Sequence, residues 1–468
     1  MASFMLQCYG RRTFSKFAES LVGKTSKFLE PTRISTLPNG IRVATEPLPG
    51  SETATVGVWI DAGSRFEDDR TNGTAHFLEH LIFKGTKRRK QKDIELEIEN
   101  IGGHLNAYTS REQTAYYAQV LRKDVPQAVD LLGDILQNST LDPLAIERER
   151  PVILREQEEV GKQMEEVVFD HLHAIAFQGS ALGRTILGPD DNIRRISRGD
   201  LEAYIKANYV GPRMVVAAAG AVDHNELVQL ATNAFKNIPM VPGEDAKWWA
   251  SPSPTVYTGS ELRLLDTTMP HAHIAIAVQG ASWTSPDYFP LLVAQAIVGS
   301  WNRGLAGGAQ VSSKLAQVVA ENDLALSFTS FNVAYSDTGL FGIYCVSDHV
   351  HDLDDLVYEI QQEWVRLCLK ADDAEVARAK QQLKSSLLLG LDGTNALTDD
   401  IGRQVLIYGK RYGWSELHAM IDAVDTAMVR NVASEYLYDR CPAVVGIGPI
   451  GSLPDYNRIR AATLWHRN

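Results

Sequence analysis

The 468-residue chain contains little cysteine. Its four cysteines are scattered, and no two stand in a C-x-x-C pair: Cys8, Cys345, Cys368 and Cys441. Disulfide scaffolds and thiolate metal sites both need cysteines in paired spacings. The sequence therefore excludes a thiolate metal site and suits a reducing compartment.

Long apolar runs and an excess of basic residues are also missing. The stretch 214–222 is among the longest apolar runs, well short of the roughly 18 residues that cross a membrane. The formal net charge is −12, whereas nucleic-acid binders normally present a basic surface. We expect no transmembrane segment and no nucleic-acid partner. An acidic cleft would instead concentrate basic ligands.

The N-terminus departs from this acidic balance. Arg11, Arg12 and Lys16 precede the first acidic residue, Glu19. A basic, hydroxyl-bearing and acid-poor start is typical of a mitochondrial transit peptide, although a tail that happens to lack acids is the plain alternative. We predict a transit peptide and leader over residues 1–34, with a processing site of the Arg-x-Phe-Ser kind that implies cleavage after Phe14.

Alternating and helical periodicities predict an α+β protein. Residues 41–65 indicate two strands around a Pro/Gly turn, and residues 104–121 indicate a hairpin. Helical patterns cover the region of His76, and residues 93–102, 126–138 and 144–160. Each half of the chain should form a mixed, mostly antiparallel sheet packed with helices.

The second half repeats the order of the first. Residues 273–282 resemble 56–65, residues 324–335 resemble the 104 region, and residues 438–448 resemble 209–220. Proline, glycine and serine gather between 241 and 261, which marks a boundary. We predict two similar domains, 35–247 and 266–468, joined by a linker over 248–265.

Two imidazoles and a carboxylate occupy one predicted helical turn in the first half. His76 and His80 are four residues apart, so they share a helix face, with Glu79 beside them. This H-x-x-E-H spacing holds a metal ion in zinc proteases, where the glutamate accepts a proton from water. The repeat places Val293, Ala296 and Ile297 opposite the trio. The polar trio is therefore not a demand of the architecture.

A catalytic zinc ion needs a third protein ligand, which the motif itself does not supply. The acid-rich stretch 144–173 is the candidate source. Residue types and spacing alone do not decide which of its glutamates is the third ligand: Glu147, Glu149, Glu156, Glu158 or Glu159.

Four blocks in order resemble the inverted-zincin, pitrilysin-like metallopeptidases, and among them the β-subunits of the mitochondrial processing peptidase. The blocks are GTAHFLEHLIFKGT, GGHLNAYTSREQTAYY, ERERPVILRE and VVFDHLHAIAFQGSALGRTILGP. The resemblance runs from about residue 37 to the C-terminus. It implies that His76, His80 and Glu156 bind one Zn²⁺ and that Glu79 is the general base.

The resemblance also implies residues that act around the metal and on the substrate. Glu149 resembles a carboxylate beside the zinc ligands, although Pro151, unusual at its place, is expected to kink the helix there. Phe77 is expected to line the pocket just past the cut. Asn106, Ala107 and Tyr108 are expected to bind an extended peptide, and Glu166 with Asp170 the arginine near the cleavage point.

A partner and a second role follow from the same resemblance. The family pairs its β-subunit with an α-subunit or a core 2-like paralogue, acts on basic presequence peptides, and works in the mitochondrial matrix or at the matrix face of the inner membrane. Residues 439–468 resemble the core 1 protein of the cytochrome bc1 complex, so other complex III subunits are expected partners as well. The alternative is a purely structural core 1 subunit without peptidase activity.

Overall fold

The computed structural model describes residues 32–241, 253–305, 311–349 and 351–465. The predicted transit peptide, with its cleavage point, lies outside this range except for the last residues of the leader. So does part of the predicted linker. None of the helices within the described ranges is long and apolar enough to cross a membrane.

The first half contains one six-stranded sheet in the order β1-β2-β6-β3-β5-β4. All neighbours are antiparallel except the parallel pair β2 and β6. Its strands are β1 (Arg33–Thr36), β2 (Arg42–Pro47), β3 (Thr53–Ile60), β4 (His104–Thr109), β5 (Thr114–Leu121) and β6 (Met214–Gly220). Its helices are α2 (Thr74–Leu81), α3 (Gln91–Asn100), α4 (Val125–Asn138), α5 (Pro143–Val160), α6 (Met164–Ala176), α7 (Asp190–Arg195), α8 (Arg198–Asn208) and α9 (His224–Ala234).

The second half contains another six-stranded sheet, in the order β7-β12-β8-β11-β10-β9. Its strands are β7 (Glu261–Leu265), β8 (Ala272–Gly280), β9 (Ser300–Asn302), β10 (Ser327–Ala334), β11 (Gly339–Ser347) and β12 (Ala443–Gly448). Its helices are α10 (Tyr288–Val298), α11 (Lys314–Glu321), α12 (Leu353–Lys370), α13 (Asp373–Leu389), α14 (Gly393–Tyr408), α15 (Trp414–Asp422), α16 (Thr426–Tyr436) and α17 (Tyr456–Trp465).

The two sheets confirm the predicted repeat. Strands β2, β6, β3, β5 and β4 follow each other across the first sheet as β7, β12, β8, β11 and β10 do across the second. The pair β7–β12 is parallel, like β2–β6. Both halves combine a mixed, mostly antiparallel sheet with helices, as the alternating and helical patterns predict.

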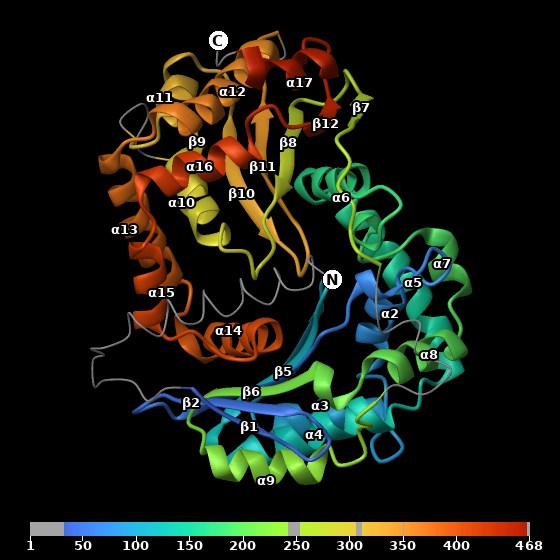
Figure 1. The fold of residues 1–468 in the computed structure, drawn as a ribbon. Coiled ribbons are helices and arrows are strands. Elements are labelled where there is room, and N and C mark those ends of the chain that lie inside the picture. The colour runs from blue at the N-terminus through green and yellow to red at the C-terminus, as the bar shows by residue number, and fades with distance from the viewer. Residues whose placement is uncertain (1–31, 242–252, 306–310, 350, 466–468) are drawn as a thin grey trace, which may run out of the picture.

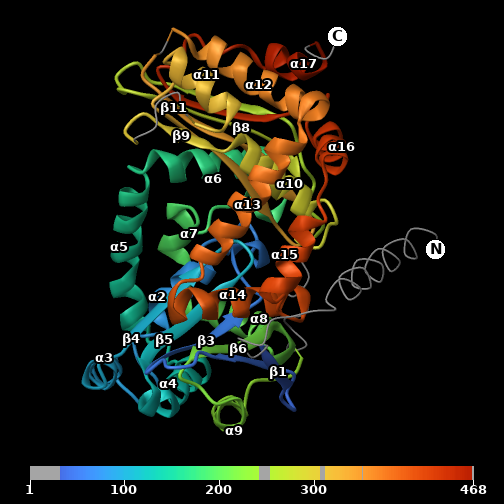
Figure 2. The same ribbon diagram turned by 90° about the vertical axis from the view of Figure 1, so that its left-hand side faces the viewer.

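The two halves exchange one helix each (Figures 1 and 2). Helix α6 packs on β8 and β12 of the second sheet, while α14 packs on β3 and β6 of the first. Each exchanged helix covers one face of the other half's sheet, opposite the face on which the main core of that other half lies. Leu172 of α6 is thereby buried in one cluster with Ala275, and Ile401 of α14 in another with Ala217. Each sheet is therefore buried on both faces only when both halves are present.

Candidate metal centre

Helix α2 carries the histidine motif, and a buried carboxylate caps its start. The helix begins after Gly73, whose φ of 102° favours glycine. Glu67 accepts hydrogen bonds from the backbone N–H of Gly73 (2.9 Å) and Ala75 (2.6 Å) and from Nδ2 of Asn72 (2.9 Å). Burial raises the pKa of Glu67 to about 8, while these donors and Arg184 favour the charged form. A negative charge at a helix N-terminus also suits the helix dipole.

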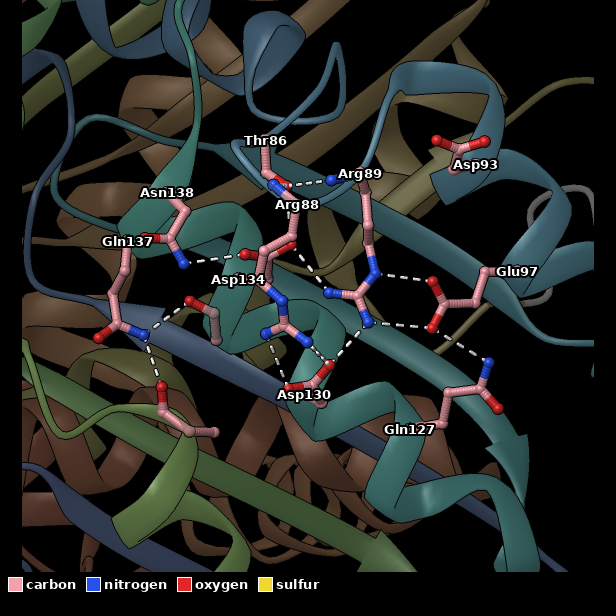
Figure 3. A network of polar contacts seen from close by, with 12 residues as sticks. Thr86, Arg88, Arg89, Asp93, Glu97, Gln127, Asp130, Asp134, Gln137 and Asn138 are labelled. Atoms are coloured by element: carbon pink, nitrogen blue, oxygen red, sulfur yellow. Dashed lines mark hydrogen bonds and ion pairs between the residues drawn. The ribbon is translucent and has the colours of Figure 1, made fainter.

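The loop that leaves α2 is held by a network of ion pairs (Figure 3). Arg89 binds Glu97 of α3 at 2.7 Å, and Asp130 (2.6 Å) and Asp134 (2.8 Å) of α4. Thr86 donates to the same oxygen of Asp134 at 2.7 Å. Both ends of the short helix are thus tied to the rest of the first half.

Three side chains from two helices converge at the centre. Nε2 of His80 lies 3.1 Å from Oε2 of Glu156, and Nε2 of His76 lies 3.6 Å from the same oxygen. The three ligand atoms lie within 4.8 Å of one another, and this is the one such group of three among the described residues. A tetrahedral zinc ion with bonds of about 2.0–2.1 Å spaces its ligands about 3.3–3.5 Å apart. The donor set and its spacing therefore fit a metal ion.

The charges at the centre reinforce each other. Hydrogen bonds to His76 and then His80 hold the pKa of Glu156 far below its usual range, although burial opposes this. Burial lowers the pKa of His80, but Glu156 and Glu149 outweigh burial and raise it. Nδ1 of His76 is buried without a hydrogen-bond partner within the described part of the chain. A bound cation would compete with the proton that Glu156 and Glu149 favour on His80.

Glu149 lies where a carboxylate would orient a metal-binding histidine. Its Oε1 is 3.1 Å from Nδ1 of His80, and its Oε2 is 2.9 Å from Nζ of Lys84. A carboxylate in this place fixes the ring and its tautomer. The helix α5 continues through the exposed Pro151, and Glu149 on that helix keeps its contact with His80.

Glu79 stands next to the centre and forms no ion pair with the described residues. It is partly exposed, one residue before His80 on the same helix. Its charge lies close to Tyr116 and Tyr209, whose hydroxyls are 3.0 Å apart. Burial raises the pKa of both phenols, and Glu79 raises each of them further. A carboxylate free of cationic partners remains available to accept a proton.

Asn106, Ala107 and Tyr108 lie on β4, the edge strand of the first sheet. β4 pairs with β5 on one side and contacts α2. The backbone N–H of Ala107 donates a hydrogen bond to Oδ1 of Asn106 at 2.8 Å. The open edge of β4 therefore runs beside the helix that carries the histidines.

Glu166 and Asp170 both lie on α6, but they differ in what they contact. Glu166 is exposed, whereas Asp170 is bound at 2.6 Å by Arg111 of the β4–β5 turn. The sequence reasoning did not anticipate Arg111, because the residues are far apart in the chain. One of the two expected arginine-binding carboxylates already has a guanidinium partner.

The structure differs from the sequence-based expectation at Phe77. Its side chain is fully buried in the main core of the first half, together with Leu78 and Leu81. The Arg150 guanidinium lies over its ring, 5.6 Å from the centroid. Phe77 and Leu81 are four residues apart, so they point to the same side of α2, into the core. Phe77 does not line an open pocket in this structure.

The described residues of the second half hold no counterpart to the centre. Val293, Ala296 and Ile297, which the repeat places opposite the three motif residues, lie on α10. Helices α10 and α13 contact each other as α2 and α5 do. The same architecture is thus built there with apolar packing.

Comparisons with known proteins agree with this picture. The family model "Insulinase (Peptidase family M16)" matches residues 42–190, and "Peptidase M16 inactive domain" matches residues 195–383. The chain is 59% identical over 431 residues to the mitochondrial-processing peptidase subunit beta of Blastocladiella emersonii, covering 92% of this chain and 91% of that one. It is 53% identical to the subunit of the same name from Rattus norvegicus, covering 93% and 88%.

A solved structure shows the same architecture. A chain of complex III2 from Candida albicans, with Inz-5 bound, superposes with a TM-score of 0.82 at 30% identity, covering 92% of this chain and 99% of that one. A duplicated α+β fold with one inverted histidine–glutamate motif, in one half only, defines a metallopeptidase whose second half is inactive. The chain belongs to the insulinase family of peptidases, family M16.

Proposed function

We propose that the chain is the metal-bearing subunit of a peptidase that removes N-terminal presequences from proteins imported into mitochondria. The observation that carries this proposal is the convergence of His76, His80 and Glu156 next to Glu79 on the same helix. The high identity to mitochondrial-processing peptidase β-subunits supports the reaction class and a mitochondrial location. Within the organelle, the matrix or the matrix face of the inner membrane is the proposed site.

His76, His80 and Glu156 would hold one Zn²⁺, with Glu149 orienting His80. Zinc, when bound, polarises the scissile carbonyl and makes water a stronger acid. Glu79 accepts the proton of the attacking water and delivers it to the departing amine. The carboxylate is near enough to the histidines to act on the same water, because it shares their helical turn.

The substrates would be basic peptides bound in extended form. An open edge such as that of β4 adds a peptide as a further strand, and Asn106, Ala107 and Tyr108 would make these contacts. Glu166 would receive an arginine near the cleavage point, with Asp170 sharing its carboxylate between the substrate and Arg111. The net charge of −12 suits such ligands.

An α-subunit or a core 2-like paralogue would complete the enzyme, as the family of β-subunits implies. The test is the purified chain with and without that subunit, assayed for zinc content and for cleavage of a basic presequence peptide. We expect about one zinc per chain and cleavage that needs the partner. Glu79→Gln should keep the zinc and abolish cleavage, since an amide does not accept the proton. Normal turnover by Glu79→Gln would rule out the general-base role.

A second role in complex III is favoured by the solved neighbour from complex III2. The chain would then serve as a core subunit on the matrix side, in addition to processing presequences. Isolation of complex III from the source cells tests this role directly. Peptidase activity recovered together with the complex supports both roles, and an inactive complex that contains the chain supports the structural role alone.

A further inference from the structure

A carboxylate from the second half contacts the edge strand β4. Oδ1 of Asp399, on α14, accepts a hydrogen bond from the Tyr108 hydroxyl at 2.6 Å and from Nε1 of Trp59 at 2.9 Å. Trp59 Nε1 also lies 3.3 Å from the Tyr108 hydroxyl. Tyr108 of β4 and Trp59 of β3 are thus joined through one oxygen of the second half.

Helix α14 is seated too closely on the sheet for this contact to be incidental. A Cβ added at Gly402 would lie 2.2 Å from the Trp59 ring. Only glycine permits this approach, because a contact of that length excludes any side chain. The helix buries its apolar side against the same sheet face through Leu397, Ile401 and Val405.

The contact keeps Tyr108 as a hydrogen-bond donor. Burial raises the pKa of Tyr108, and the charge of Asp399 raises it further. Arg403, whose Nη1 is 3.7 Å from Oδ2 of Asp399, partly balances that charge. The phenol therefore stays protonated, and its hydroxyl proton points to Asp399.

An edge strand has a ladder on one side only, so its position depends on side-chain contacts. We propose that Asp399 is a positioning residue that holds β4, through Tyr108, in the place where the extended substrate pairs with it. The inference rests on the proposed function of β4. It gives the second half an indirect part in substrate binding, through the contact of α14 with Tyr108.

The test uses the full chain with its partner subunit and a fluorescently labelled basic presequence peptide. In a Glu79→Gln background the peptide binds without being cut, so anisotropy gives its Kd. We expect Asp399→Ala to raise Kd about tenfold, about 1.4 kcal/mol. In the active enzyme the same change should raise KM and leave kcat and zinc content unaltered. Asp399→Asn should recover most of the affinity, because its amide oxygen still accepts both bonds.

Two further variants separate positioning from a general loss of stability. Asp400→Ala removes the neighbouring carboxylate, which binds Arg411 and Gln404 instead of Tyr108 and Trp59. Asp400→Ala should leave Kd unchanged, even if both variants lower Tm by the same amount. Tyr108→Phe should raise Kd, and combining it with Asp399→Ala should add little.

The outcomes also distinguish this inference from the proposed function. Wild-type affinity in Asp399→Ala, or an equal loss in Asp400→Ala, would overturn the positioning role while the peptidase proposal stands. Failure of the wild-type complex to bind or cut any basic peptide would instead overturn the proposed function, and this inference with it.

Discussion

His80 Nε2 and Glu156 Oε2 lie 3.1 Å apart, although they belong to the separate helices α2 and α5. This contact completes a group of three side chains that could hold a metal ion, two of which, His76 and His80, lie on one helix. Without Glu156 only two protein ligands would remain, and catalytic zinc sites normally use three.

Glu156→Ala should therefore remove the metal. With one of three ligands lost, the purified variant should hold far less than one zinc per chain after dialysis and should not cut peptides. Zinc content by atomic absorption is the measurement. Glu158→Ala, which changes an exposed carboxylate two residues along the same helix, is the matched control and should keep its zinc. Full zinc in Glu156→Ala would place the third ligand elsewhere.

Glu166→Gln should weaken processing only of substrates with an arginine near the cut. A hydrogen bond to a charged group is worth roughly 1.5–3 kcal/mol, partly replaced by water at this exposed position, so kcat/KM should fall about tenfold. Kinetics on paired peptides with and without that arginine measure the effect.

Asp170→Asn should behave differently, because it also breaks the ion pair with Arg111. Its loss should extend to the arginine-free peptide. If Glu166→Gln lowered kcat/KM equally for both peptides, the Glu166 carboxylate would act on folding rather than on the substrate.

Arg89→Ala should destabilise the first half by about 3–5 kcal/mol. The change leaves the fully buried Asp134 without its cation, and it frees the loop that follows α2 (Figure 3). Chemical denaturation of the metal-free chain gives the free energy of unfolding. Arg88→Ala, which removes an exposed partner of Asp130 in the same loop, should cost less than about 1 kcal/mol. Similar costs for the two variants would show that burial of Asp134 does not set the penalty.

Neither half should fold alone. A fragment of residues 32–241 lacks α14, so Trp59 and three residues of β6 would face water: Val215, Ala217 and Ala219. We expect no cooperative thermal transition, and strong binding of a hydrophobic dye. The control is the intact chain cut at a protease site placed within 242–252, which should keep its cooperative unfolding. A cooperative transition in the 32–241 fragment, at the Tm of the whole chain, would contradict the exchange of helices as a folding requirement.

Local patterns in the sequence were enough to predict most of the elements and two residues of the candidate metal centre. Strand alternation, helical periodicity and the repeat each depend on neighbours a few residues apart, and they predicted both sheets and the equivalence of α2 with α10. The spacing of His76 and His80 predicted a shared face for the same reason. Glu156 needed a resemblance, since five glutamates on one acid-rich stretch are locally alike.

Tertiary packing alone decided which residues meet across the chain. The exchange of α6 and α14 could not be predicted from periodicity, because an apolar helix face has the same sequence pattern whichever sheet it covers. Tertiary packing buries Phe77, forms the ion pair between Arg111 and Asp170, and forms the hydrogen bond from Tyr108 to Asp399. Each of these depends on the distance between segments far apart in sequence, which only the folded chain sets.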